Sequence, residues 1–413
     1  MNAIGGQRGR ALLRGAQRFE RKPGWFARAL APAFHRMVDR VDAGLATGSI
    51  LANLPDGTTR LLGGRTPGFD AQIDIADWRA LMRLATNGSI GWYQAWAAGE
   101  WRSDDPVLIF ANFNANAKSL GATGRAKGPF RWAMAFAHWL NRNSRAGSTR
   151  NIHAHYDLGN DFYTQWLDPT MSYSSAIFAD GDSLEQAQRR KWAALSERCG
   201  SAQTVLEIGC GWGSLADHFA KGGATVTAIS LSDEQLEWAR EHSDAAIDFR
   251  KQDYRDVETQ VDAIVSVEMV EAVGRAFWPA FLDSLARNLK PGGRAALQYI
   301  TFDDDLFDAY ADSADFIQAY VFPGGLLIRE SAFRKLAERR GFRWTDKHDF
   351  ALDYARTLKI WRENFDAAVE EGRLPAGFDA RFVALWRYYL MYCEGGFRGG
   401  GIGVSQVTLV KED

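Results

Sequence analysis

The chain has 413 residues, of which 46% are hydrophobic and 24% are charged, and its formal net charge is −2. This is the composition of a globular protein with one large domain and a smaller one, and it excludes a disordered or fibrous chain. No segment is apolar for the roughly 18 residues that a membrane-spanning helix needs, so we expect none. The three cysteines, Cys199, Cys210 and Cys393, lie far apart and predict neither a disulfide framework nor a metal site. A cytoplasmic protein with free thiols is the simplest interpretation.

Two basic segments contrast with the small net charge. Residues 1–40 hold nine Lys or Arg, and residues 111–150 hold seven with no acidic residue. Basic residues beside apolar ones suit an anionic bilayer surface. The alternative is a solvated basic face or a nucleic-acid contact. We expect peripheral binding at the inner face of a membrane and no nucleic-acid partner. The aromatic residues of the two segments include Phe19, Trp25, Phe26, Phe34, Phe130, Trp132, Phe136 and Trp139.

The first part of the chain predicts a small α+β domain over residues 1–130. Asp56-Gly57 between two short strand patterns is a hairpin signal. The polar stretch 141–149 is typical of a connection, and residues 131–413 are expected to form the second domain. The predicted elements of the first part are a basic amphipathic helix at 1–40, strands at 48–54, 58–62 and 71–75, and helices at 77–87, 89–98 and 106–117.

The rest of the chain alternates strands and helices. Such alternation with right-handed crossovers predicts an α/β fold with a doubly wound sheet. The stretch Leu289-Lys-Pro-Gly-Gly293 predicts a turn that ends a helix before the fifth strand. The seven strand candidates are 204–208, 225–229, 247–250, 263–267, 293–300, 342–350 and 404–410.

A glycine-rich segment follows the first of these strands. Glu207 lies in the strand, and Gly209, Gly211 and Gly213 come directly after it, before a predicted helix. A strand, a tight Gly turn and a helix start are typical of nucleotide-binding α/β folds. The glycines let the backbone approach a ligand, because a Cβ would block it. A purely structural turn is the alternative. The spacing differs from the dinucleotide fingerprint and resembles the first motif of S-adenosylmethionine-dependent methyltransferases.

Further motifs extend this resemblance over nearly all of residues 150–410. With them the chain resembles the cyclopropane-fatty-acyl-phospholipid synthase family, and Glu-Met-Val-Glu-Ala-Val-Gly at 268–274 is similar to its plant branch. The resemblance implies a seven-stranded Rossmann-like methyltransferase sheet with a smaller N-terminal α+β domain. The motifs are 155–163 with Tyr173-Ser174, the Gly loop with Trp212, Leu231-Ser-x-x-Gln235 and 265–274, supported by 315–325, 354–358 and 388–393.

The resemblance implies S-adenosylmethionine as the cofactor and S-adenosylhomocysteine as its product. The implied cofactor contacts are Tyr173 and Ser174 for the methionine part, Gly209 and Gly211 through their backbone, Ser230, Leu231 and Gln235 for the ribose, and Asp253 and Tyr254 for the adenine. Trp212 and Tyr254 are explained equally well as core aromatic residues. His153 and His155 are interpreted as hydrogen-bonding groups rather than metal ligands, because no cluster completes a metal site.

The implied reaction transfers a methyl group to the cis double bond of an unsaturated phospholipid acyl chain. This leaves a cation on the lipid, and loss of a proton from the added methyl closes a cyclopropane ring. Such a site needs a dry apolar channel that keeps water off the cation. It also needs a base near the methyl group.

The base site departs from the common bacterial pattern. In many bacterial members the base is a bicarbonate held by a Cys, a Glu, a His, a backbone carbonyl and a Tyr. The corresponding positions here are Ser175, Glu271, Gln298, Ile300 and Tyr354, so two of the four side chains differ. A second acid, Glu268, stands where those enzymes have Gly. Two carboxylates in an apolar pocket do not ionise together easily, so we expect one pKa to rise. Glu268 either replaces the bicarbonate, helps to bind it, or only bonds a neighbouring turn.

Several functions stay open. The cation can lose a different proton, which would give a methyl-branched, methylene or furan-precursor fatty acid. An N-methyltransferase of a small amine is less consistent with the basic N-terminal segment. A catalytically inactive lipid- or cofactor-binding protein would have little reason to keep Glu271 and the Gly loop. The sequence leaves the oligomeric state undecided, with a homodimer as one option.

Overall fold

The structure, a computed structural model, describes residues 31–121, 158–312 and 315–412. Backbone contacts divide the chain into two units that are each built from separate stretches of sequence. The expected domain boundary at 130/131 and the expected connection at 141–149 lie outside the described residues. The first unit comprises residues 1–141, 305–323 and 376–402, and the second comprises residues 142–304, 324–375 and 403–413.

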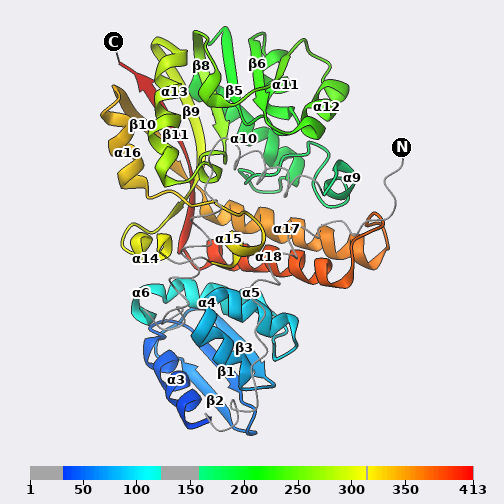
Figure 1. Ribbon diagram of the computed structural model, residues 1–413, viewed down its shortest axis with the longest axis vertical. Helices are drawn as coiled ribbons and strands as arrows, with labels where there is room; N and C mark the ends of the chain where they lie inside the picture. The colour runs from blue at the N-terminus through cyan, green and yellow to red at the C-terminus, as the bar shows by residue number, and fades with distance from the viewer. Residues whose placement is uncertain (1–30, 122–157, 313–314, 413) are drawn as a thin grey trace. The chain divides into compact units, whose positions relative to one another are not determined.

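The second unit contains a seven-stranded sheet in the order β10-β11-β9-β8-β5-β6-β7 (Figure 1). The five strands from β9 to β7 run parallel, and β10 pairs antiparallel with β11. The order reverses between β5 and β8, as in a doubly wound sheet. All seven predicted strands are confirmed. Their bounds are β5 (Thr204–Ile208), β6 (Thr225–Ser230), β7 (Asp248–Lys251), β8 (Val261–Val267), β9 (Leu289–Phe302), β10 (Phe342–Asp349) and β11 (Ile402–Lys411).

Helices pack on this sheet through apolar residues. Leu195, Leu215 and Leu236, from three different helices, share one buried cluster with Val205 of β5. Ser183 begins the first long helix with a capping box, in which its side chain and that of Gln186 satisfy each other's backbone N–H groups. The helices of this unit are α9 (Asn160–Tyr163), α10 (Leu184–Cys199), α11 (Ser214–Lys221), α12 (Asp233–His242), α13 (Trp278–Asn288), α16 (Glu330–Glu338) and α17 (Ala351–Glu370), with 3-10 turns η1 (Tyr254–Asp256), η2 (Val270–Ala272) and η3 (Arg275–Phe277).

The predicted turn at 289–293 is an irregularity within β9 instead of a separate connection. Strand pairing already begins at Leu289, opposite Val261, and the next pair is Arg294 with Ala263. Four residues of β9 therefore bulge out opposite one residue of β8. The helix does end before this point, at Asn288, so only the start of the strand was mispredicted.

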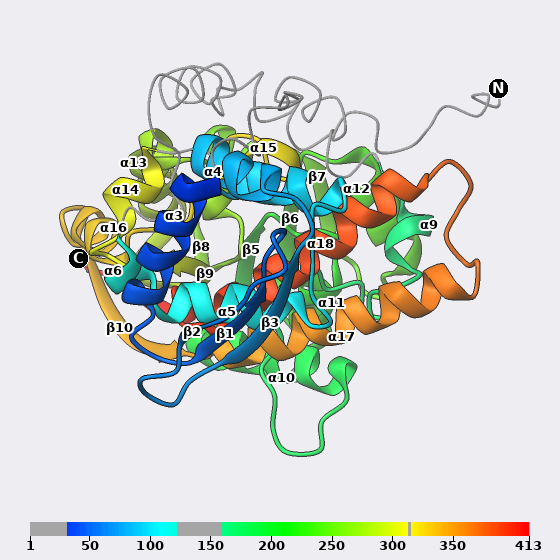
Figure 2. The same ribbon diagram turned by 90° about the horizontal axis from the view of Figure 1, so that it is seen from below.

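The first unit contains a small sheet in the order β2-β1-β3-β4, part of which is seen in Figure 2. The predicted hairpin is confirmed, because β1 and β2 pair antiparallel around the turn at Gly57. Strand β3 pairs parallel with β1. The elements are α3 (Ala31–Gly44), β1 (Ser49–Asn53), β2 (Thr59–Gly63), β3 (Asp70–Ile75), α4 (Arg79–Ala97), β4 (Trp101–Arg102), α5 (Pro106–Ala115), α6 (Ala117–Leu120), α14 (Phe307–Ala311), α15 (Phe316–Tyr320) and α18 (Ala380–Arg398).

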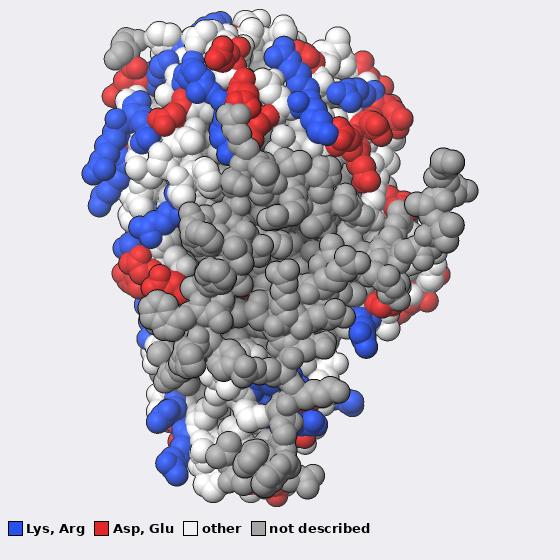
Figure 3. Space-filling view, viewed as in Figure 1, with Lys and Arg blue, Asp and Glu red and all other residues white. Residues whose placement is uncertain are grey.

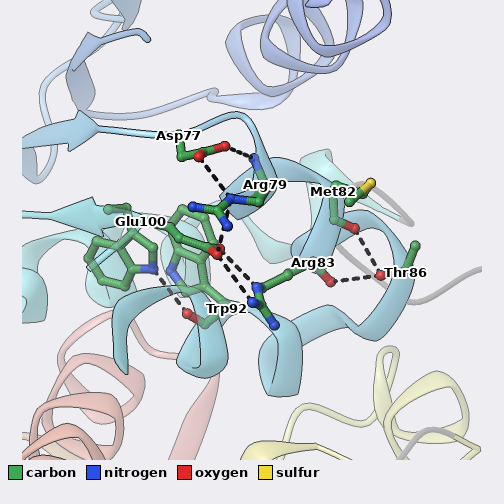
Figure 4. Close-up of polar contacts among 8 residues, drawn as sticks. Asp77, Arg79, Met82, Arg83, Thr86, Trp92 and Glu100 are labelled. Atoms are coloured by element: carbon green, nitrogen blue, oxygen red, sulfur yellow. Dashed lines mark hydrogen bonds and ion pairs between the residues drawn. The ribbon is translucent and has the colours of Figure 1, made fainter. Parts of the chain in front are cut away.

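A buried acid joins α4 to β4 in this unit (Figure 4). Glu100 is 3% exposed, and Arg83 donates to both of its carboxylate oxygens, at 2.8 and 3.1 Å. Arg79 approaches the same carboxylate at 3.6 Å. Next to it, the indole N–H of Trp101 donates to the carbonyl of Trp92 at 3.0 Å. A buried charge is costly unless it is paired. We therefore interpret these contacts as structural, because they hold α4 to the segment that begins β4.

The basic segments are described only in part. Phe34 is a core residue, 6% exposed and stacked on Trp78 at 5.7 Å, so its expected role at a membrane surface is wrong. The other seven aromatic residues named above for these segments lie outside the described residues. Within residues 31–121, 158–312 and 315–412, no helix is long and apolar enough to span a bilayer.

The three cysteines are free thiols. Figure 3 shows Lys and Arg interspersed with Asp and Glu on the described surface of the face in view.

Candidate active site

The predicted site segments meet at one edge of the seven-stranded sheet. Gly209 follows β5, Ser230 ends β6, Asp253 follows β7 and Glu268 follows β8. These strands are parallel neighbours and end close together, since Ile208 pairs with Ile229 and Ser230 pairs with Lys251. The carboxyl ends of such strands are where α/β sheets bind ligands.

The three glycines of the loop differ in what surrounds them. A Cβ on Gly209 would lie 2.9 Å from Met269, and one on Gly213 would lie 2.8 Å from Ala239. A Cβ on Gly211 would meet no atom within 4 Å. Gly209 and Gly213 are therefore required by packing. The backbone at Gly211 borders open space, which fits a ligand that a side chain would displace.

Polar groups at the end of β6 are hydrogen-bonded to one another. The Ser230 hydroxyl donates to the amide oxygen of Gln235 at 3.1 Å, and both residues are buried. Ser232 caps α12 by accepting from the backbone N–H of Gln235 at 3.3 Å. Because its oxygen is used, the Gln235 amide presents its NH2 group as a donor. Leu231, between them, is half-buried.

The residues expected at the adenine have protein partners of their own. Asp253 forms an ion pair with Arg255, and the side chains of both are 13% exposed. It also caps the 3-10 turn that begins at Tyr254. Tyr254 is buried and packs edge-on against Phe281 at 5.7 Å. These contacts hold the segment in place, so a structural role is sufficient to explain both residues.

An aromatic cluster surrounds Tyr173. Its ring lies 5.6 Å from that of Tyr163 and 5.3 Å from that of Trp361. Tyr163 also packs against Trp212, with 5.0 Å between the ring centroids. The indole N–H of Trp212 donates to the side-chain oxygen of Asn160 at 2.7 Å. Trp212 thus joins the Gly loop to α9, which favours its interpretation as a core aromatic residue.

Glu268 accepts hydrogen bonds from three of the positions assigned to the base site. Its Oε1 accepts from the Ser175 backbone N–H at 2.9 Å and from the Gln298 amide at 2.8 Å. Its Oε2 accepts from the Tyr354 hydroxyl at 2.6 Å. Ser175 contributes its backbone rather than its side chain, because its hydroxyl donates to the carbonyl of Ala176. Burial raises the pKa of Glu268, while these donors oppose the rise by favouring the charged form.

The backbone of Glu268 is held in an unusual conformation. Its φ is +49°, in the left-handed region that costs a residue with a side chain roughly 1–2 kcal/mol. Its N–H donates to the carbonyl of Gln298 at 2.8 Å, which fixes this conformation. Such local strain is concentrated at functional sites. The strained conformation occurs at the residue whose carboxylate lies among the donors of Ser175, Gln298 and Tyr354.

Glu271 is the less satisfied of the two acids. It is 8% exposed, and its Oε1 accepts from the backbone N–H of Ile300. Its Oε2 is buried without a hydrogen-bond partner among the described residues. Burial raises the pKa of Glu271 to about 8; the Ile300 N–H opposes the rise and the charge of Glu268 adds to it. With three donors to its carboxylate, Glu268 is the better stabilised of the two acids in its charged form.

Ile300 contributes differently from the expectation. Its N–H bonds Glu271, whereas its carbonyl, the group expected to hold a bicarbonate, accepts from the backbone N–H of Ile328 at 3.1 Å. A carbonyl has two lone pairs, so this bond does not prevent a second one. It does place the carbonyl in a bridge between Thr301 and Ile328.

Two further residues were missed by sequence reasoning. Lys191 in α10 is 2% exposed and donates from Nζ to the Ser174 hydroxyl oxygen at 2.7 Å. Its place on the apolar stripe of Leu184 and Leu195 was an available signal. Gln406 donates to the Gln298 amide oxygen at 3.0 Å. This orients the Gln298 NH2 group toward Glu268, and nothing in the sequence pattern pointed to it.

Comparison with known proteins identifies the family of the chain. Residues 143–407 match the profile of the family described as mycolic acid cyclopropane synthetase. The chain is 36% identical over 357 residues to the tuberculostearic acid methyltransferase of Mycobacterium tuberculosis, covering 80% of this chain and 81% of that protein. It is 34% identical over 345 residues to the cyclopropane-fatty-acyl-phospholipid synthase of Escherichia coli, covering 83% and 88%.

Solved structures of methyltransferases also resemble this chain. A mycolic acid cyclopropane synthase in complex with SAH and CTAB superposes with a TM-score of 0.60 at 28% identity, covering 64% of this chain and 98% of that one. Coclaurine N-methyltransferase reaches 0.59 at 18% identity over 78% and 98%, a likeness of fold alone. The implied family and cofactor are confirmed: the chain belongs to the mycolic acid cyclopropane synthetase family and is an S-adenosylmethionine-dependent methyltransferase of the cyclopropane-fatty-acyl-phospholipid synthase type.

Proposed function

We propose that this protein transfers a carbon from S-adenosylmethionine to the cis double bond of an unsaturated phospholipid acyl chain and forms a cyclopropane ring. The observation that carries the proposal is the carboxylate of Glu268, which accepts hydrogen bonds from Ser175, Gln298 and Tyr354. These donors come from the positions that hold the bicarbonate base in the bacterial enzymes the chain resembles.

The residues present fit the cofactor. Gly211 borders open space, and Gln235 presents an amide donor at the end of the neighbouring strand. When bound, S-adenosylmethionine supplies an electrophilic methyl group. The residues proposed to hold it are Tyr173, Ser174, Gly209, Gly211, Ser230, Leu231, Gln235, Asp253 and Tyr254.

Glu268 is proposed as the base. Among the described residues, its Oε2 accepts the Tyr354 hydroxyl alone, so a second lone pair is available for a proton from the substrate. Burial raises the pKa of Glu271 to about 8, which favours its protonated form, whereas the three donors around Glu268 favour a charged carboxylate there. A carboxylate of the protein then performs the role of bicarbonate, and no added anion is needed.

We also propose that the protein reaches its substrate at an anionic membrane surface on the cytoplasmic side. The substrate chain is part of a bilayer, and the basic segments 1–40 and 111–150 would be attracted to anionic headgroups. In the described part of these segments, Lys118 pairs with Asp305 at 2.7 Å and Phe34 is buried. The proposal therefore rests on residues 1–30 and 122–150.

A methylene or methyl-branched product is the second candidate. It is favoured by the 36% identity to a tuberculostearic acid methyltransferase and by the altered base site. The experiment is expression in a host without its own synthase, followed by mass spectrometry of the extracted lipids. A mass gain of one CH2 that resists catalytic hydrogenation supports the ring. A product with the same mass gain that takes up hydrogen supports a methylene or unsaturated methyl-branched chain, and unchanged lipids would contradict both candidates.

A further inference from the structure

Lys191 is a buried cation that the proposed chemistry leaves unused. It belongs to α10 (Leu184–Cys199), which is capped by Ser183 and packs on β8 and β9 of the sheet. A buried ammonium group is unfavourable unless charged or polar partners surround it. The charges of three acids, Glu268, Asp168 and Glu207, act on it favourably. Burial lowers the pKa of Lys191 to about 8, and these acids oppose the change.

The direction of its hydrogen bond has a consequence for Ser174. An ammonium group donates and cannot accept, so the Ser174 oxygen must be the acceptor in the 2.7 Å contact with Lys191. The hydroxyl hydrogen of Ser174 is then left to donate to another group. Gln188, one turn earlier in the same helix, donates to the Ser174 backbone carbonyl at 3.0 Å. Helix α10 thus fixes both the backbone and the hydroxyl of this residue.

We propose that Lys191 is a positioning residue that makes the Ser174 hydroxyl a hydrogen-bond donor for the carboxylate of the cofactor's amino-acid part and places a positive charge behind it. This rests on the proposed role of Ser174 in cofactor binding. A hydroxyl that is polarised by an ammonium group is a stronger donor than an isolated one. A carboxylate is the ligand group that such a donor and charge recognise.

Lys191 also lies near the charge of Glu268, and this offers a competing explanation. In that case its loss would change the pH dependence of turnover and leave the binding of the cofactor product intact. A measurement of binding alone separates the two, because it involves no proton transfer to Glu268.

The experiment compares two ligands by calorimetry. S-adenosylhomocysteine carries the amino-acid part, whereas methylthioadenosine keeps the nucleoside and lacks that part. We expect Lys191→Met to weaken the binding of S-adenosylhomocysteine about ten-fold or more, as for a lost hydrogen bond to a charged group. The affinity for methylthioadenosine should stay unchanged. Ser174→Ala should have the same selectivity, and the loss in the double variant should be smaller than the two single losses combined, because part of the effect of Lys191 acts through Ser174. Arg189→Met, which removes an exposed cation paired with Glu185 on the same helix, should match the parent.

The opposite results are equally clear. If folded Lys191→Met binds S-adenosylhomocysteine as the parent does, or loses both ligands to the same degree, the positioning role is wrong. If it does not fold, Lys191→Gln keeps a donor for Ser174 and removes the charge, and the same comparison decides. A parent enzyme that binds neither ligand would instead overturn the cofactor site itself, whatever Lys191 does.

Discussion

The Tyr354 hydroxyl donates to Oε2 of Glu268 at 2.6 Å. The second acid, Glu271, is three residues further along and has a buried oxygen without a partner among the described residues. Two acids of the same type are thus given different proton affinities by their surroundings. Donors favour a charged Glu268, and burial favours a protonated Glu271.

The first prediction concerns the base. Glu268→Gln keeps the shape of the side chain and removes its proton acceptor, so turnover should fall by about 10²–10⁴-fold, the usual contribution of a general base. Binding of S-adenosylhomocysteine should change little. Steady-state assays and calorimetry measure the two effects. Glu237→Gln, at an exposed position of α12, is the control and should retain full activity. Normal turnover in Glu268→Gln would show that this acid is only structural.

The second prediction concerns the Gly loop. Gly211→Val should abolish binding of S-adenosylmethionine, because the side chain would enter the open space beside the backbone. Gly223→Val is a matched control, since Gly223 also has a positive φ and open surroundings but lies in a turn after α11. It should show similar backbone strain with normal affinity. Calorimetry on both folded variants is the measurement, and equal affinities would remove the assignment of Gly211.

The third prediction uses the raised pKa of Glu271. Its ordinary value of 4.5 rises to about 8 in the folded protein, so the folded state binds this proton more tightly than the unfolded state does. The free energy of unfolding should therefore decrease as the pH rises between these two values. In Glu271→Gln this part of the pH dependence should disappear. Urea unfolding across the range, compared between parent and variant, isolates it from Glu207, which shifts in the same direction. Identical slopes would contradict the raised pKa.

The fourth prediction concerns the membrane. The protein should sediment with anionic vesicles at low salt and be released at high salt, because salt screens exposed charges. Neutral vesicles are the control. Deleting residues 1–30 should weaken the attachment. If binding is equal on both vesicle types at every salt concentration, the electrostatic explanation fails.

Much of the fold could be predicted because its signals are local. The apolar runs at 204–208 and 225–229, separated by a helical pattern, are sufficient for parallel strands. The two-residue strand β4 carries no periodicity, and the bulge at the start of β9 depends on its pairing with β8. Both are decided by tertiary contacts that a local pattern does not contain.

As with the fold, only part of the site could be predicted from the sequence. Motif comparison selected Ser175, Gln298 and Tyr354, and the structure places all three around Glu268. Motif comparison could not show that Ser175 uses its backbone N–H, because this depends on how the backbone is oriented at that residue. Lys191 was missed since a lysine in a helix usually faces solvent.

The central claim is that a protein carboxylate occupies the role of bicarbonate, and Glu268→Gly tests it most directly. Glycine suits the φ of +49° and leaves Ser175, Gln298 and Tyr354 free to hold a small anion. Parent and variant are assayed in carbonate-depleted buffer with and without added bicarbonate. We predict that the parent is indifferent to bicarbonate and that the inactive variant regains turnover when it is added. A parent that requires bicarbonate, with no rescue of the variant, would contradict the account.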